Sequence, residues 1–300
     1  MLDFIGTIVL TAAIIFSINA LTGAMPIGPS QRVALSVGAG LWTGLAAALA
    51  GANLFLGSNP AGPPTIGTMI VLPLVATAVA AWISPTVRAA LLGMPMPFLI
   101  GLNVWRLAGA FFILLAAEGR LAGPFPTSAG WGDVITGALA LPVAWLALRG
   151  HGKTAIWAWN AFGTLDLVVA LALGISSANG SPLQILHVGV GSEGVQMLPW
   201  SLIPSVLVPM YLIVHGVIFA QLARASRGKE ASATMMRGAG PRPVDNGNSG
   251  DISHRRLAQS ALLRLNVAIL RRWETIASVS GSSSRLPRFA AATDQNTAGR

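Results

Sequence analysis

The chain has no cysteine, and charged residues make up only 10% of its 300 positions. The first absence excludes disulfides, iron–sulfur clusters, thiolate metal sites and cysteine nucleophiles. The second excludes an ordinary soluble domain, in which about one quarter of the residues are charged. Hydrophobic residues account for 53% of the chain. We therefore expect lipid, rather than water, to surround most of the polypeptide, with no large extramembrane domain.

Recognised catalytic, nucleotide-binding and metal-binding motifs are also absent. A membrane haem with two axial histidines is not favoured, because His151 and His187 lie in predicted loops and leave His215 alone in an apolar run. A retinal-type Schiff base is not favoured either, since Lys153 and Lys229 both lie outside the apolar runs. No paired His and Glu motif of the metalloprotease kind occurs. We expect no cofactor and no metal, and an enzyme is the least favoured of the functions considered.

What the chain does have is seven apolar runs, each close to the ~20 helical residues that cross a bilayer. The runs are Phe4–Leu21, Val33–Phe55, Ile66–Ile83, Met96–Ala117, Trp131–Leu148, Trp157–Ile175 and Leu198–Ala223. This pattern predicts an all-α, polytopic bundle of seven transmembrane helices over residues 1–223.

The basic residues between the runs predict the orientation of the helices. They occupy the first, third and fifth loops and the start of the tail: Arg32, Arg88, Arg149, Lys153, Arg224, Arg227 and Lys229. The second and sixth loops have none, and only Arg120 breaks the alternation. Because Lys and Arg near helix ends are retained in the cytoplasm, we expect the N-terminus outside and the C-terminus in the cytoplasm.

Three ionisable residues fall inside the apolar runs, where burial of a charge costs at least ~2.5–3.5 kcal/mol unless it is paired. Counting 1.5 Å per residue, Arg106 and Asp166 lie about 13–15 Å from the cytoplasmic boundary and His215 about 12 Å from it. We therefore expect all three to share one layer. Asn103 and Asn160 lie one to two turns closer to the cytoplasm on the same helices.

This polar layer has two interpretations. Arg106 and Asp166 can form an ion pair that only fixes helix packing, with His215 donating to a carbonyl. Alternatively, the layer is a binding or proton-relay site, since a histidine can change charge near neutral pH. The residues alone leave both open.

A second polar cluster is expected at the outer face. Glu118 and Arg120 close the fourth run, and Asp133 opens the fifth run near a helix N-terminus, where negative charge is favoured. Four tryptophans near the ends of the runs are expected to be interfacial anchors: Trp131, Trp157, Trp159 and Trp200.

The tail carries most of the net charge of +9. Residues 224–252 are rich in Gly, Ser, Asn, Arg and Pro, so we expect a disordered linker there. Residues 253–279 combine apolar positions at helical spacing with five arginines, which predicts a basic amphipathic helix. We expect this helix to lie on anionic inner-leaflet lipids rather than to bind nucleic acid. Residues 280–300 are expected to be disordered.

Several segments carry a resemblance to a family of uncharacterised bacterial polytopic membrane proteins. They are Arg106 followed by Gly109 and Phe111, then EGRLAGPFPTSAGWGD ending at Asp133, WAWNAFGTLD ending at Asp166, and IPSVLVPMYLIVH ending at His215. The resemblance covers residues 103–216, and the first three runs and the tail find no counterpart. It implies a multi-helix membrane domain with no established activity.

The leading hypothesis is an integral inner-membrane protein that handles a small solute or protons through the layer of Arg106, Asp166 and His215. The alternative is a structural or regulatory membrane subunit in which the same residues only fix helix packing. Lipid is the expected partner, and association with a second copy or another membrane protein is left open.

The predicted orientation can be tested with reporter fusions. A reporter that is active only in the cytoplasm should be inactive at the N-terminus and active when fused after Arg227, because the basic loops hold that end inside. An active N-terminal fusion would contradict the orientation.

Overall fold

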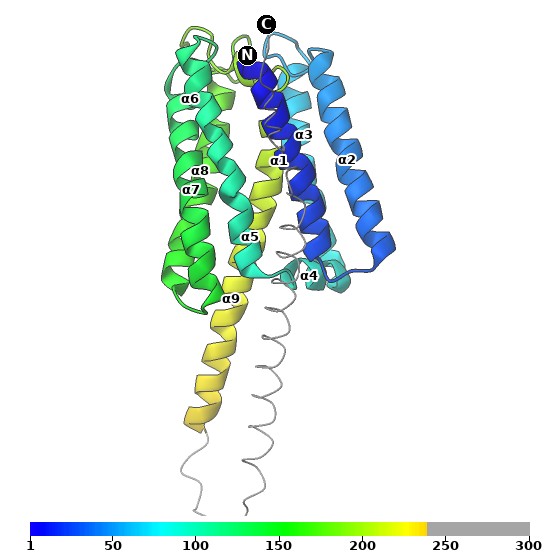
Figure 1. Cartoon of the computed structure of the whole chain (residues 1–300), viewed down its shortest axis with the longest axis vertical. Coiled ribbons are helices and arrows are strands. Elements are labelled where there is room, and N and C mark those ends of the chain that lie inside the picture. Colours follow the sequence, from blue (N-terminus) through cyan, green and yellow to red (C-terminus); the bar gives the residue numbers. More distant parts are fainter. Residues whose placement is uncertain (239–300) are drawn as a thin grey trace, which may run out of the picture. The chain divides into compact units, whose positions relative to one another are not determined.

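A computed structural model describes residues 1–238, and these residues form helices joined by turns (Figure 1). In chain order the elements are α1 (Leu2–Ala24), α2 (Pro29–Gly51), α3 (Gly62–Ile83), α4 (Pro85–Leu92), α5 (Met96–Leu102), η1 (Asn103–Gly109), α6 (Ala110–Ala117), α7 (Pro124–Leu148), α8 (Lys153–Ser176), η2 (Glu193–Val195), η3 (Ile203–Leu207) and α9 (Val208–Gly238). The expected all-α architecture is confirmed for this part of the chain.

Seven helical segments within the described residues are long and apolar enough to cross a membrane, as the sequence predicts. The fourth combines α5, η1 and α6 over Met96–Ala117, and the seventh combines η3 with the start of α9 over Ile203–Arg227. By helix length and hydropathy, the protein is a multi-pass membrane protein.

Two predicted boundaries were wrong. The fifth span begins at Pro124 rather than at Trp131, because Gly123 adopts a φ of 79° and Pro124 occupies the first helical turn. The last span begins at Ile203 rather than at Leu198, because residues 198–201 form turns. Both shifts change the depth at which polar residues lie.

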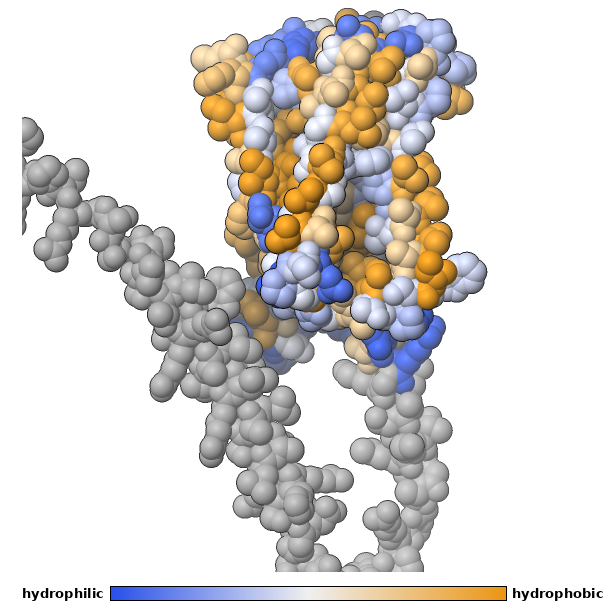
Figure 2. Space-filling model, turned by 90° about the vertical axis from the view of Figure 1, so that its right-hand side faces the viewer, coloured by the Kyte–Doolittle hydropathy of each residue, from blue (hydrophilic) through white to orange (hydrophobic). Residues whose placement is uncertain are grey.

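In Figure 1, α9 lies between α1, α2 and α3 on one side and α5 to α8 on the other. It is accordingly the most buried span, whereas α2 and α3 are mostly exposed. Large apolar side chains on these peripheral helices point outward, with Leu41 70% and Trp82 79% exposed. Figure 2 shows apolar residues along the side of the bundle and hydrophilic ones at its two ends. A surface with apolar sides and hydrophilic ends is suited to a lipid bilayer.

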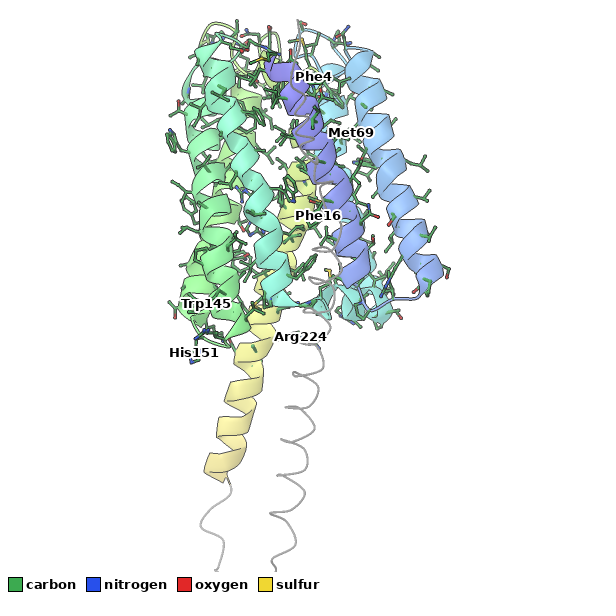
Figure 3. All side chains as sticks on the ribbon, viewed as in Figure 1. Phe4, Phe16, Met69, Trp145, His151 and Arg224 are labelled. Carbon is green, nitrogen blue, oxygen red and sulfur yellow. The ribbon has the colours of Figure 1, made fainter. Side chains whose placement is uncertain are left out.

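Apart from Arg120, which contacts Asp3, the basic residues in the connections between spans lie at the end of the bundle opposite the N-terminus. Figure 3 shows His151 and Arg224 there, with Phe4 near the other end. At that other end the loop between α8 and η3 is fixed by hydrogen bonds: the Gly57 amide donates to Gln196 Oε1 at 2.8 Å, and the Ala122 amide donates to the Gly191 carbonyl at 2.9 Å.

Two of the four expected tryptophan anchors are buried instead. Trp131 and Trp157 are more than half exposed, but Trp200 is fully buried and Trp159 nearly so. Trp200 packs against the backbone of Gly6, and its indole donates to Asp3 Oδ1 at 2.7 Å. The indole N–H groups therefore find partners inside the protein rather than at a lipid–water boundary.

Prolines in the last span coincide with irregular backbone. The turn Ile203–Leu207 is a π-helix, and Pro209 cannot donate to the carbonyl one turn earlier. That carbonyl, of Ser205, accepts from Trp42 Nε1 at 3.3 Å. A neighbouring helix thus satisfies the group that proline leaves free.

Helix α9 continues to Gly238, so helix occupies the first part of the segment 224–252 that we expected to be a linker. The remainder of that segment, the predicted amphipathic helix 253–279 and the terminal segment 280–300 lie outside the described residues.

The packing of α1 on Trp200 gives a testable prediction. A Cβ at position 6 would overlap the Trp200 ring, so Gly6→Ala should lower the free energy of unfolding by roughly 1–3 kcal/mol. Gly38→Ala on α2 is the control, since no atom lies within 4 Å of its added methyl group. Thermal unfolding in detergent micelles measures both, and equal midpoints would contradict the packing.

Candidate functional site

A buried guanidinium lies at the centre of the bundle. Arg106, on η1, is 2% exposed and contacts three other spans. Its Nε donates to Asp133 Oδ1 at 2.6 Å, and its Nη2 donates to Asp166 Oδ2. Its Nη1 donates to the Gly163 carbonyl and to His215 Nε2, both at 3.1 Å. We call Arg106, Asp133, Asp166 and His215 the Arg106 cluster.

Glycines permit the close approach of the helices that carry the cluster. A Cβ at Gly109 would overlap the Asp133 side chain, and one at Gly163 would lie 2.8 Å from His215 Cε1. Gly132 likewise leaves the space that the Asp166 carboxylate occupies. Any side chain at these positions would push the charged groups apart.

The histidine is held in one tautomer. Arginine can only donate, so His215 Nε2 accepts from Arg106 and the ring proton is on Nδ1. Nδ1 donates to Asn160 Oδ1 at 2.7 Å, and Asn160 Nδ2 donates to the His215 carbonyl at 3.1 Å. His215 is therefore a neutral hydrogen-bonded link between Arg106 and Asn160.

The other expected residue of this layer lies apart. Asn103 is fully buried and donates to the Leu99 carbonyl at 3.0 Å. Its Oδ1 has no partner among the described residues, and no hydrogen bond joins it to Arg106 there. The structure thus brings together Arg106, Asp166, His215 and Asn160 but not Asn103.

The expected outer cluster is only partly present. Arg120 contacts Glu118 Oε2 at 3.6 Å, but Asp133 is not with them. Because α7 begins at Pro124, Asp133 lies nine residues into the helix, about 14 Å from its start, and reaches Arg106 instead. The stronger partner of Arg120 is Asp3, at 2.7 Å, which the sequence did not indicate.

The charges of the cluster do not balance. One guanidinium faces two carboxylates, from Asp133 and Asp166, and His215 is neutral in this arrangement. The cluster therefore has one negative charge in excess when both carboxyl groups are ionised. A buried excess charge of this kind requires a proton or a bound cation to neutralise it.

Two adjoining cavities meet the cluster at Asp133. A cavity of about 180 Å3 extends from the turns at the end of the bundle that holds the N-terminus to Asp133. A second, of about 20 Å3, is lined by Arg106, Asp133 and Tyr211. Leu167 and two residues of the last span also line both cavities.

Tyr211 is a residue that sequence reasoning missed. It is 3% exposed, and its hydroxyl has no hydrogen-bond partner among the described residues. It is the only tyrosine of the chain and precedes His215 by four residues, so both lie on one face of α9. This four-residue spacing is the sequence feature that could have identified Tyr211. For Asp133, the corresponding feature was Gly123 followed by Pro124, which is typical of a helix start and would have placed Asp133 inside the helix.

Metal chemistry was not expected from the sequence. Within the part of the chain that the structure describes, no three side chains of His, Asp or Glu are arranged to hold a metal ion.

The geometry around Arg106 predicts that lysine cannot replace it. A lysine ammonium cannot reach groups on three helices, so Arg106→Lys should lower the free energy of unfolding by about 3–5 kcal/mol, as for other broken buried pairs. The matched control is Arg120→Lys, whose partners are exposed, with an expected loss below about 1 kcal/mol. Chemical unfolding in micelles compares the two, and similar losses would contradict the buried geometry.

Comparison with known proteins supplies a family but no activity. A family described as "Domain of unknown function (DUF8737)" matches residues 63–223. The match contains the whole Arg106 cluster and also α3, for which the sequence resemblance had indicated no counterpart. No curated protein and no solved structure matches the chain. Since the match covers more than half of the 300 residues, the chain belongs to this DUF8737 family of unknown function.

Proposed function

We propose that the protein moves protons, coupled to the movement of a small solute, through the Arg106 cluster. The observation that carries the proposal is the presence of two carboxylates on one guanidinium in the middle of a seven-span bundle. Ionisable groups at this depth are costly to retain and are typical of proton relays and transport pathways.

The carboxyl groups are the sites that would take up and release the proton. With one charge in excess, a proton on Asp133 or Asp166 neutralises the cluster, and its loss restores the negative charge. His215 is a poorer candidate, because a proton on Nε2 would face the Arg106 donor at 3.1 Å. We therefore assign His215 to positioning Arg106.

Irregular backbone around the cluster supports the proposal. Arg106 lies on a 3-10 segment inside a membrane-length helix, and the π-helix Ile203–Leu207 lines both cavities near Asp133. Such interruptions are frequent at functional sites, and at membrane depth they are tolerated where they line a cavity.

The loop charges support an orientation for this pathway. The end that carries Arg32, Arg88, Arg149 and Lys153 faces the cytoplasm in our proposal, and the larger cavity then faces outward. The membrane would be a bacterial inner membrane, with its anionic lipids bound by the segment 253–279.

One observation favours the alternative of a structural or regulatory subunit. Arg106 joins η1 to α7, α8 and α9, so the cluster also fixes the packing of four spans. Full retention of proton uptake after the charges of Arg106, Asp133 and Asp166 have been removed would support this alternative.

Proton movement is tested in liposomes that contain the full chain and a pH-sensitive dye, with a potassium gradient and valinomycin setting the potential. Asp133→Asn and Asp166→Asn should each reduce proton uptake by about tenfold or more, since each removes a group that ionises. Glu118→Gln, at an exposed carboxyl beyond the end of α6, is the matched control and should leave uptake unchanged.

A neutral triple variant separates transport from packing. Arg106→Met with Asp133→Asn and Asp166→Asn removes all three charges together, so that no charge is left buried and unpaired. We expect it to fold, as judged by circular dichroism and size exclusion, and to move no protons. Uptake equal to that of the unmodified chain, or no uptake by the unmodified chain above empty liposomes, would overturn the proposal.

A further inference from the structure

The larger of the two cavities that meet at Asp133 is walled by apolar side chains from several spans. Ile66 and Ile70 of α3, Phe125 of α7, Leu167 and Leu171 of α8, and Ile203 of η3 line its sides. Its volume is about 180 Å3. A dry apolar cavity of about 150 Å3 is large enough to bind benzene. The space therefore suits a molecule of about one aromatic ring with a short substituent.

The cavity has a polar rim at its outer end. Gln196 and Ser192 line it there, and both are already engaged in hydrogen bonds. Gln196 Oε1 accepts from the Gly57 amide at 2.8 Å, and Ser192 Oγ donates to the Gly174 carbonyl at 2.7 Å. These residues hold the loop between α8 and η3 against the bundle and leave little capacity for a charged ligand.

A free acceptor lies at the inner end. Asp133 is 9% exposed and lines the cavity, and its Oδ1 accepts from Arg106. Its Oδ2 receives no hydrogen bond from any described residue. Arg106, by contrast, uses its three nitrogens on Asp133, Asp166, His215 and a carbonyl. The cavity is thus lined by a carboxylate that has one oxygen without a partner, whereas the guanidinium that pairs with it is fully engaged.

A second polar group, independent of the carboxylates, points to a ligand. The hydroxyl of Tyr211 is buried without a partner beside Asp133 and Arg106. The adjoining cavity of about 20 Å3 exceeds the ~10–15 Å3 that one water molecule requires. A donor group of a bound molecule, or a water that it holds, can reach both Asp133 and Tyr211 from this junction.

Charge selects the ligand class. When both carboxyl groups are ionised, the cluster has one negative charge in excess. An anion is then repelled, and a neutral molecule leaves the excess charge uncompensated. A cation that donates hydrogen bonds to Asp133 neutralises it. Because the walls are apolar, the rest of the molecule must be a hydrocarbon.

We propose that the 180 Å3 cavity binds a small apolar monoamine, with its ammonium group on Asp133 Oδ2 and its hydrocarbon body between α3, α8 and η3. This inference rests on the proposed function, for which it names the solute: the amine and the proton compete for the same carboxyl group. Binding of one then displaces the other, which is the basis of exchange.

The test is calorimetric titration of the purified full chain in detergent micelles near pH 7. Benzylamine is the probe, benzyl alcohol is its neutral counterpart of similar size, and benzoate is the anion. We expect benzylamine to bind at least about tenfold more tightly than the alcohol, as a charge-assisted hydrogen bond implies, and benzoate not to bind.

Two variants locate the site. Asp133→Asn should weaken benzylamine binding about tenfold or more while leaving benzyl alcohol unaffected, which also shows that the cavity is intact. Ala170→Phe fills the cavity from α8 and should abolish binding of both. Val168→Phe, half exposed on the same helix, is the matched control and should change neither.

Equal affinity for benzylamine and benzyl alcohol, with no effect of Asp133→Asn, would overturn the proposal and indicate an apolar space suited to a lipid chain. Absence of benzylamine binding would also overturn it. The liposome assay tests transport separately. If benzylamine binding depends on Asp133 but the liposomes take up no protons, the proposed transport is wrong and the amine site is supported. If the liposomes take up protons but benzylamine does not bind, the amine site is wrong and the proposed proton transport is supported.

Discussion

The contact between Arg106 and the two carboxylates is the interaction on which the rest of the bundle depends. A guanidinium at mid-membrane must be paired, and its partners here come from α7 and α8, with His215 of α9 completing the set. Each partner fixes the rotation of its own helix about its axis. The register of four spans is thus tied to one side chain, and apolar packing fills the space around it.

Close packing of the backbone follows from that constraint. The carboxylates have short side chains, so α7 and α8 must approach closely for both to reach Arg106. Gly109, Gly132 and Gly163 provide that approach at the three crossings. The peripheral helix α2 shows the contrast, since its glycines face open space and it holds no member of the cluster.

Much of the fold was predictable, because length and apolarity alone define membrane spans. Counting residues at a constant helical rise also placed Arg106, Asp166 and His215 at similar depth, and they touch. Asp133 was misplaced because a helix start shifted by seven residues moves a side chain by two turns. Trp200 was misassigned because hydropathy does not show how the loop before the last span folds inward. Tyr211 lies one helical turn before His215, but its burial beside Asp133 depends on side-chain packing, which that spacing does not show.

The bond between Asp3 and Trp200 joins residues 197 positions apart. It places the start of the first helix against the start of the last span, with Gly6 beneath the indole ring. During synthesis the first helix enters the membrane long before Trp200 exists. The face of the first helix that carries Gly6 therefore stays uncovered until Trp200 has been synthesised. The contact that completes the packing of this helix forms only when the last span is made.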